Sequence, residues 1–574
     1  MEQDSGTDEG REQVGGVGPP GSISRRRLLQ SAAAAGLTIG AMQVDPDLAA
    51  AHGHGRRPGA DAHRGTGTHG ATEVPTWGEG GRAVPVTGLH LQFGADASNE
   101  VVVTWQTYAA VAAPRVFVGT LADGVGERPV HASTKHYVDP KEPDVPVYIH
   151  SARLTGLTPD SEYFYLAVHD GADPETGGFR TAPSERAAFT FTSFGDQGTP
   201  TVTAPTNLPS PAPKFANDNL GSPAAGDLPD GIEEVAPLFH LVNGDLCYAN
   251  LSTVPVRTWS DWMANNSRSA RYRPWMPTAG NHENENLGTH GFLAYQQHFT
   301  VPSNGEGDDL DGMWYSFRAG SVKVIALNND DVCLQDAGSR YVHGYSNGAQ
   351  KAWLERELKA ARKDRSIDWI VVCMHQVAMS TASAFNGADL GIRQEWLPLF
   401  DAYEVDLVVA GHEHHYEREL PVRGTNGSAL LTPKPSQTAT DVIDTTKGTQ
   451  HMIIGGGGTS APSNGLLTTP PVCRVITSVG PAKTAVSASA PDGHFIPNYE
   501  NEDAIWLATR DEEWAYGFAS FRVDPGDRPG GTTRIHVTYY RVKAFGGGLE
   551  EFDSFTLERP RRDGRRSRVG APRG

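Results

Sequence analysis

The stretch "VDLVVAGHEHHYER", Val405 to Arg418, joins a run of apolar residues directly to three histidines within four positions. A short apolar run of this kind is typical of a strand buried inside a sheet. Histidine at such density is most useful where neutral imidazoles must converge on a metal ion. The stretch therefore predicts a buried strand whose carboxyl end carries metal ligands.

Four other apolar runs end in the same way, on residue types that can ligate a metal. Because sites in open α/β sheets form at the carboxyl ends of the strands, these residues should meet at one edge. Between two of the runs, Trp353, Leu354 and Leu358 follow helical spacing, which indicates an α/β layered domain. The four runs are "FTFTSFGD" ending at Asp196, "APLFHLVNGD" at Asp245, "PWMPTAGNHE" at Asn281 and His282, and "DWIVVCMH" at His375.

The predicted edge carries more ligands than a single ion needs. A structural zinc site takes four ligands and is usually rich in cysteine. Two ions about 3.5–4 Å apart that share a carboxylate would use the whole set, and such a pair clamps both oxygens of an in-line phosphoryl displacement. It would also supply the local positive charge that a chain of formal charge −19 lacks for an anionic substrate.

The motifs "GDQG", "GDLCY", "GNHE", "MHQ" and "GHEHHYER", in this order, resemble those of the calcineurin-like metallophosphoesterases. The tyrosine of "GDLCYA" narrows the resemblance to the purple acid phosphatases, which also carry an N-terminal fibronectin-like domain. The resemblance covers roughly Val84 to Leu557. It implies a four-layer α/β/β/α sandwich preceded by an all-β, immunoglobulin-like or fibronectin III-like sandwich.

Carried over by position, the resemblance implies a ferric ion paired with a divalent ion, which is iron, zinc or manganese. The phenolate of the tyrosine ligand would give a purple charge-transfer colour. The ligands implied are Asp196, Tyr248 and His414 for the ferric ion, Asn281, His375 and His412 for the divalent ion, and Asp245 as the bridge.

His282 follows a ligand without being one, and the resemblance implies that it orients the phosphate and protonates the leaving alcohol. Many purple acid phosphatases carry further substrate-side histidines after the fourth motif, but "HQVAMSTASAFNGADLG" has none after His375. Substrate contacts are therefore expected from Asn281 and His282, with Gln376, Asn386 or backbone amides on the other side. His415 and Arg418 are expected to be outer or surface groups.

Residues 84–183 have the alternating pattern of an all-β domain. In "NEVVVTWQT", Val101, Val103 and Trp105 occupy one face of a predicted strand. "LTGLTPDSEYFYL" places Tyr163 where an immunoglobulin-like sandwich has its tyrosine corner. The segment carries no clustered chemistry, so we expect it to pack against the catalytic domain, residues 187–558.

The two ends of the chain have compositions of their own. Residues 1–51 contain the pair Arg25–Arg26 followed by an alanine-rich apolar run, which is typical of a twin-arginine export signal. Residues 52–83, rich in glycine and histidine, are expected to be a disordered linker. Residues 559–574, with seven arginines, are expected to be a basic disordered tail. The protein is therefore expected to be secreted or associated with the cell envelope.

Composition excludes several function classes. The formal charge of −19 argues against a nucleic-acid partner. No stretch has the length of a transmembrane helix. The four cysteines are too few for a disulfide scaffold, although pairing of Cys333 with Cys473 stays open.

Taken together, the motifs predict an exported acid phosphatase that hydrolyses small-molecule phosphate monoesters by attack of a metal-bound hydroxide. A phosphodiesterase or nucleotidase on the same scaffold is the alternative. A non-catalytic cell-surface binding protein is the remote third reading, and it is disfavoured because every expected ligand type is present. The sequence does not determine the oligomeric state.

Overall fold

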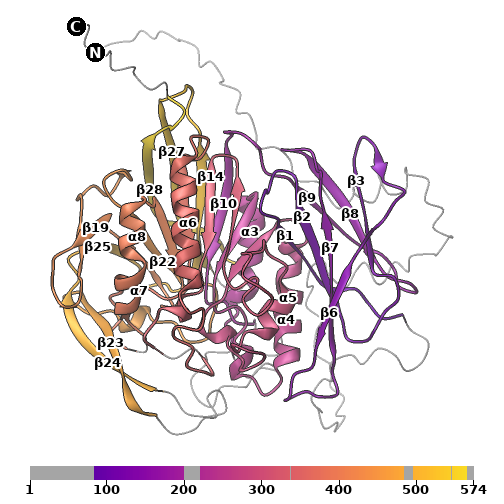
Figure 1. Cartoon of the computed structure of the whole chain (residues 1–574), viewed down its shortest axis with the longest axis horizontal. Helices are drawn as coiled ribbons and strands as arrows, with labels where there is room; N and C mark the ends of the chain where they lie inside the picture. The colour runs from indigo at the N-terminus through magenta and orange to yellow at the C-terminus, as the bar shows by residue number, and fades with distance from the viewer. Residues whose placement is uncertain are drawn as a thin grey trace, which may run out of the picture. The chain divides into compact units, whose positions relative to one another are not determined.

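The computed structural model describes residues 83–199, 220–335, 338–384, 386–483, 495–543 and 546–564 (Figure 1). The predicted export signal and the predicted linker up to residue 82 lie outside the described residues, as does the predicted tail from residue 565.

The sequence predicts a disordered tail from residue 559, and this boundary is wrong because the first residues of the predicted tail are ordered. Strand β28 (Gly548–Pro560) continues through Arg559, which is buried and bonded to the carboxylate of Asp406. Arg562 follows in the same ordered segment, where its backbone N–H donates to Asp368 Oδ1 at 2.8 Å. A buried ion pair at Arg559 and a backbone hydrogen bond at Arg562 thus hold residues that look in the sequence like part of a solvated basic run.

The N-terminal region is an all-β sandwich, as predicted. One sheet has the order β1-β2-β7-β6 and the other the order β4-β3-β8-β9, with β5 pairing to β3. The strands are β1 (Thr87–Phe93), β2 (Val101–Thr107), β3 (Arg115–Thr120), β4 (Gly124–Val125), β5 (Val130–His131), β6 (Ser133–Tyr137), β7 (Val147–Leu154), β8 (Glu162–Val168) and β9 (Glu175–Arg180).

Two details of the sandwich show how it is built. The Tyr163 hydroxyl accepts a hydrogen bond from the Thr158 backbone N–H at 2.9 Å, which is the contact of a tyrosine corner. Every residue of β2 is buried, so the expected polar face of this strand is not exposed to water. The reason is a contact with the next domain: Ser151 Oγ, beside β2, lies 2.9 Å from Thr300 Oγ1.

The catalytic domain contains two seven-stranded sheets of mixed direction. The first has the order β12-β11-β10-β26-β27-β28-β21, and β10, β11 and β12 in it run parallel. Apart from β28, whose range is given above, the strands of this sheet are β10 (Phe189–Phe194), β11 (Phe239–Asn243), β12 (Trp275–Thr278), β21 (Val442–Asp444), β26 (Gly517–Asp524) and β27 (Thr532–Lys543).

The second sheet has the order β13-β14-β15-β17-β22-β18-β25, with β14, β15, β17 and β22 parallel. Its strands are β13 (Tyr315–Ala319), β14 (Val322–Ala326), β15 (Trp369–Cys373), β17 (Leu407–Ala410), β18 (Tyr416–Glu419), β22 (Gln450–Ile454) and β25 (Leu507–Arg510). The stretch "VDLVVAGHEHHYER" supplies β17 and most of β18 in this sheet.

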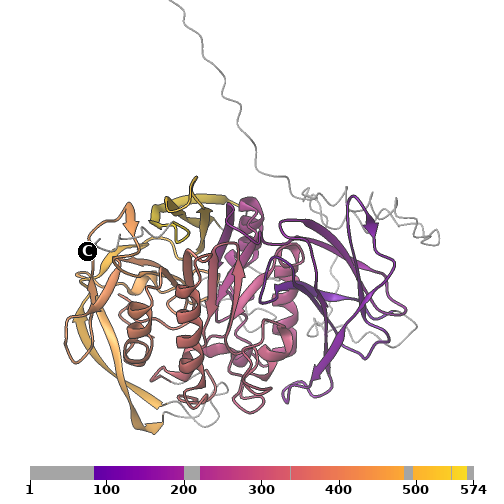
Figure 2. The same ribbon diagram turned by 45° about the horizontal axis from the view of Figure 1, so that its top comes forward.

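The two sheets pack face to face and the helices cover them, which gives the predicted four-layer sandwich (Figures 1 and 2). Across the sheet interface, the rings of Tyr416 and Tyr539 stack with centroids 3.9 Å apart. The predicted helix is α6 (Ala349–Lys363), and it buries Trp353 and Leu358. The other helices are α3 (Ala224–Val235), α4 (Pro255–Ala270), α5 (Leu293–His298), α7 (Leu390–Glu395) and α8 (Leu397–Ala402), with single 3-10 turns η1 (Ala249–Leu251), η2 (Asn281–Glu283), η3 (Asn329–Asp331) and η4 (Asn464–Leu466).

Smaller elements complete the domain. A ribbon of β23 (Val472–Lys483) and β24 (Phe495–Asp503) pairs with β16 (Ala388–Asp389), and β19 (Val422–Thr425) pairs with β20 (Pro433–Pro435). Cys333 and Cys473 are not paired: both thiols are free and buried, as are those of the other two cysteines. Within the described ranges, no helix combines the length and the apolar character that crossing a bilayer requires.

Candidate metal centre

Five strands deliver a candidate ligand just beyond their carboxyl ends, from both sheets. In each case the ligand follows the last strand residue by two or three positions, as expected for a site at the carboxyl edge of parallel strands. The pairs are β10 with Asp196, β11 with Asp245, β12 with Asn281, β15 with His375, and β17 with His412.

A first set of donor atoms converges from Asp196, Tyr248 and His414. The Tyr248 hydroxyl lies 3.3 Å from Asp196 Oδ1 and 3.2 Å from His414 Nε2. The third side of this triangle, from His414 Nε2 to Asp196 Oδ1, measures 3.4 Å. Three oxygen and nitrogen donors thus surround one point.

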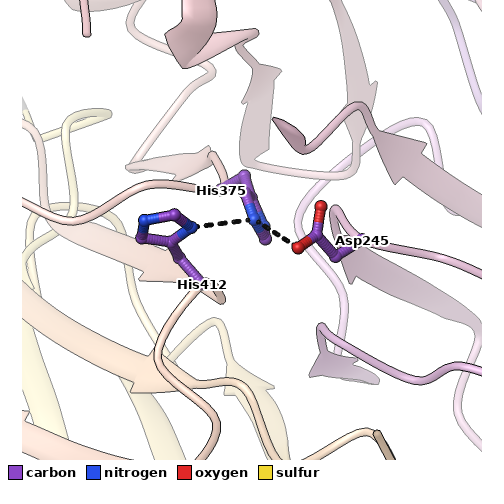
Figure 3. Close-up of side chains that lie close together, drawn as sticks. All are labelled: Asp245, His375 and His412. Atoms are coloured by element: carbon purple, nitrogen blue, oxygen red, sulfur yellow. Dashed lines mark hydrogen bonds and ion pairs between the residues drawn. The ribbon is translucent and has the colours of Figure 1, made fainter. Parts of the chain in front are cut away.

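A second set converges from Asn281, His375 and His412. Asn281 Oδ1 lies 3.1 Å from His375 Nε2 and 3.1 Å from His412 Nδ1, and the two imidazole nitrogens are 3.2 Å apart. Asp245 Oδ2 adds a fourth donor, 3.1 Å from His375 Nε2 (Figure 3). The donor atoms of Asp245, His375 and His412 all lie within 4.8 Å of one another, close enough to share one ion.

The spacing of both triangles fits transition-metal coordination. Nitrogen and oxygen ligands bind such ions at about 2.0–2.2 Å, so neighbouring ligands at right angles stand about 3 Å apart. The observed edges of 3.1–3.4 Å match this spacing. The donor chemistry also fits two ions, because one set contains a phenol and a carboxylate and the other two imidazoles.

The backbone at these positions is held in an unusual conformation. Asp196, Asp245, Tyr248 and His412 have φ values of +60°, +52°, +58° and +71°, a region that non-glycine residues seldom occupy. Residues held in this region cluster at functional sites. Close packing supports them: a Cβ on Gly411 would stand 2.3 Å from Asp196 Oδ2.

The electrostatics of the cluster suit a cation. Burial alone lowers the pKa of His375, but the negative charges of Asp245 and Asp196 outweigh it and raise that pKa to about 10. The pKa of Asp245 is held below its usual value. Burial raises this pKa, but the positive charges of His375 and His282 lower it by more than burial raises it. The buried carboxylates therefore stabilise a positive charge beside them, and bound metal ions would supply that charge in place of the proton on His375.

His282 lies beside the cluster without joining either triangle. Its backbone N–H donates to Asp245 Oδ1 at 2.8 Å, and its ring Nδ1 lies 3.0 Å from Asn250 Oδ1. The ring packs on that of Tyr248, with centroids 4.6 Å apart. The side chain is therefore fixed at the edge of the centre.

Two residues that the sequence analysis did not select support this arrangement. Glu283 is buried, and its carboxylate accepts from the backbone N–H groups of Asp245 and Leu246 at 2.8 Å and of Gly280 at 2.7 Å. Asn250 orients His282. The only sequence signal was adjacency, since Glu283 follows His282 and Asn250 follows Tyr248 by two positions.

The remaining candidates are bonded elsewhere. Gln376 is buried and donates to Asp330 Oδ1 at 2.5 Å, so contact with substrate would require it to rearrange. Asn386 donates to the His412 carbonyl at 2.6 Å. His415 Nε2 lies 3.1 Å from Glu417 Oε2. The fourth, Arg418, pairs with the carboxylate of Asp553 at 2.7 Å.

Comparison with known families gives two matches. Residues 86–202 match the family model of the purple acid phosphatase N-terminal domain. Residues 225–416 match that of the calcineurin-like phosphoesterases. The second match contains six of the seven candidate ligands, all except Asp196.

Among curated proteins, an uncharacterised protein of Mycobacterium tuberculosis is 52% identical over 546 residues, covering 95% of this chain and 97% of that protein. A phosphoenolpyruvate phosphatase of Allium cepa is 27% identical over 342 residues, 58% of this chain and 63% of the relative. Mouse acid phosphatase type 7 is 25% identical over 410 residues, 68% and 81% of the two chains.

Among solved structures, a purple acid phosphatase from yellow lupin (Lupinus luteus) seeds superposes with a TM-score of 0.58 at 20% identity, covering 84% of this chain and 75% of that one. PhoD superposes with a TM-score of 0.50 at 12% identity, covering 82% and 91%. At these identities the likeness concerns the fold alone.

Proposed function

The chain belongs to the purple acid phosphatases, within the calcineurin-like phosphoesterases, and we propose that it hydrolyses phosphate monoesters at a dinuclear metal centre outside the cytoplasm. Family membership makes it a phosphatase. The single observation that carries the finer proposal is the pair of donor triangles, one through Tyr248 and one through Asn281, with Asp245 beside them.

In this proposal the two triangles hold two different ions. Asp196, Tyr248 and His414 suit a ferric ion, since phenolate and carboxylate are hard anionic donors. Asn281, His375 and His412 suit a divalent ion such as iron, zinc or manganese. When bound, the ions supply a hydroxide near neutral pH and positive charge that offsets the phosphate.

The chain's own residues perform the remaining steps. The Asn281 amide and the His282 ring line the side of the centre where the phosphate is proposed to lie. With Nδ1 of His282 bound to Asn250, the proton for the departing alkoxide is assigned to Nε2. Glu283 keeps Asp245 and Gly280 in place through their backbone N–H groups.

The experiment that tests this function uses the purified full chain. We expect two metal ions per chain, visible absorption, and faster turnover on monoesters than on diesters. Asp245→Asn should lower the occupancy of both ions and nearly abolish turnover, whereas Asp308→Asn, an exposed position, should change neither. A wild type that is active with no metal, or that turns over only diesters, would contradict the proposal.

Export is proposed from the segment around Arg25–Arg26. Replacing both arginines by lysine should leave the protein in the cytoplasmic fraction of a host with a twin-arginine pathway. Equal amounts of both versions outside the cytoplasm would reject a twin-arginine route.

A further inference from the structure

The segment that begins at η3 contacts all three residues of the second donor set. Asn329 Oδ1 accepts from the His375 backbone N–H at 2.7 Å. The amide nitrogen of Gln335, Nε2, lies 2.6 Å from His412 Nε2. Gly338 N–H donates to the carbonyl of Asn281 at 2.6 Å.

A different segment holds the first donor set. His414 Nδ1 lies 2.5 Å from the carbonyl of Ala461, and Thr459 N–H donates to the carbonyl of Asp196 at 3.0 Å. The two triangles therefore have separate supports, and a change in one support should affect one ion more than the other.

The contact from Gln335 bears on which nitrogen of His412 can bind a metal. His412 Nδ1 is the atom that faces Asn281 Oδ1 and His375 Nε2, and Figure 3 shows the other ring nitrogen turned away from His375. A ligating nitrogen must offer its lone pair, so in the neutral ring the proton belongs on Nε2. That N–H needs an acceptor, because the ring is buried.

Gln335 can provide this acceptor. As placed, the amide turns its nitrogen toward the ring, and an N–H there favours the tautomer that cannot ligate through Nδ1. A 180° rotation of the amide exchanges its nitrogen and oxygen at nearly the same positions, and the oxygen then receives the Nε2 proton. The side chain is only 9% exposed. Its backbone is anchored as well: Asp389 Oδ2 accepts from the N–H groups of Leu334 at 2.8 Å and of Gln335 at 3.3 Å.

We propose that Gln335 is a positioning residue for the second metal ion: with its amide rotated so that the oxygen faces the ring, it holds His412 in the tautomer and orientation that direct Nδ1 into the site. The inference rests on the proposed dinuclear function. Partners of this kind fix ring orientation in metal sites, and their loss typically weakens metal binding by about 10–100-fold.

An isosteric series tests the proposal on the purified full-length protein loaded with metal. Gln335→Met keeps the length of the side chain but removes the acceptor, and Gln335→Glu keeps an acceptor. Gln437→Met is the matched control, because its amide donates only to the Asp444 carbonyl among the contacts described. Metal content and competition with a chelator give the affinity of each ion, independently of turnover.

We expect Gln335→Met to bind one ion, that of the donor set containing His412, about 10–100-fold less tightly while keeping the other, and Gln335→Glu to bind both as the wild type does. Wild-type affinity in Gln335→Met would overturn the proposal. So would equal weakening of both ions, which indicates a general structural role. A wild type that binds fewer than two ions would instead refute the dinuclear function on which the proposal rests.

Discussion

Replacing His282 by alanine isolates proton delivery from metal binding. The His282 ring lies outside both donor triangles, so His282→Ala should leave both ions in place. General acid catalysis contributes about 10²–10⁴-fold, and kcat should fall by that factor for alkyl phosphates, whose leaving groups need a proton. For nitrophenyl phosphate, a good leaving group, the loss should be much smaller. Asn250→Ala removes only the bond that orients the ring, about 1 kcal/mol or roughly fivefold in rate.

The assay compares kcat on the two substrate types, with metal content measured on the same samples. His131→Ala, at an exposed position in the N-terminal sandwich, is the matched control and should behave as the wild type. Equal losses on good and poor leaving groups would refute the assignment and leave His282 with phosphate orientation alone. Loss of either ion would instead make His282 part of the support of the centre.

Three further predictions concern colour, stability and pH. Tyr248→Phe should bleach the visible absorption and leave part of the activity; an unchanged spectrum would remove Tyr248 from the ferric site. Glu283→Ala leaves three buried N–H donors without an acceptor, and each loss costs about 1–3 kcal/mol. Chemical denaturation should therefore show a free energy of unfolding at least about 3 kcal/mol lower. Burial, with the charge of His90, lowers the pKa of His298 to about 3, so the unfolded chain binds an extra proton below about pH 6.5 and stability falls from there toward pH 3. Melting curves should show this slope in the wild type and a smaller one in His298→Asn.

The strand-end residues were the predictable part of the site. An apolar run followed by Asp, Asn or His needs only the rule that parallel strands share a carboxyl edge, and the structure brings Asp196, Asn281 and His412 together there. Predicting that these residues meet required no knowledge of the loops between the strands. The same rule gave no role for Glu283, because a buried carboxylate that binds three backbone N–H groups has no periodic signature.

The long-range contacts were the unpredictable part. Gln335 reaches His412 across 77 positions of sequence, and Asn329 reaches His375 across 46. Loop segments carry no periodicity, so sequence gives no register for such pairs. The prediction for β2 failed for a related reason. Alternation predicts one buried face and one exposed face, but the second face of β2 is covered by a domain that is distant in sequence.

The described part of the segment after His375 leaves few polar groups free to contact a substrate on its side of the centre. This segment lacks the substrate-side histidines of many purple acid phosphatases, and its polar residues are used inside the fold. Thr381 N–H donates to Glu417 at 3.2 Å, Asn386 donates to the His412 carbonyl at 2.6 Å, and Asp389 accepts from the Leu334 N–H at 2.8 Å. Since these groups are bonded inside the fold, the proposed function leaves the orientation of the phosphate to the bound ions, Asn281 and His282. A substitution at His282 should therefore change catalysis more selectively than one in this segment, which would disturb the ligands themselves.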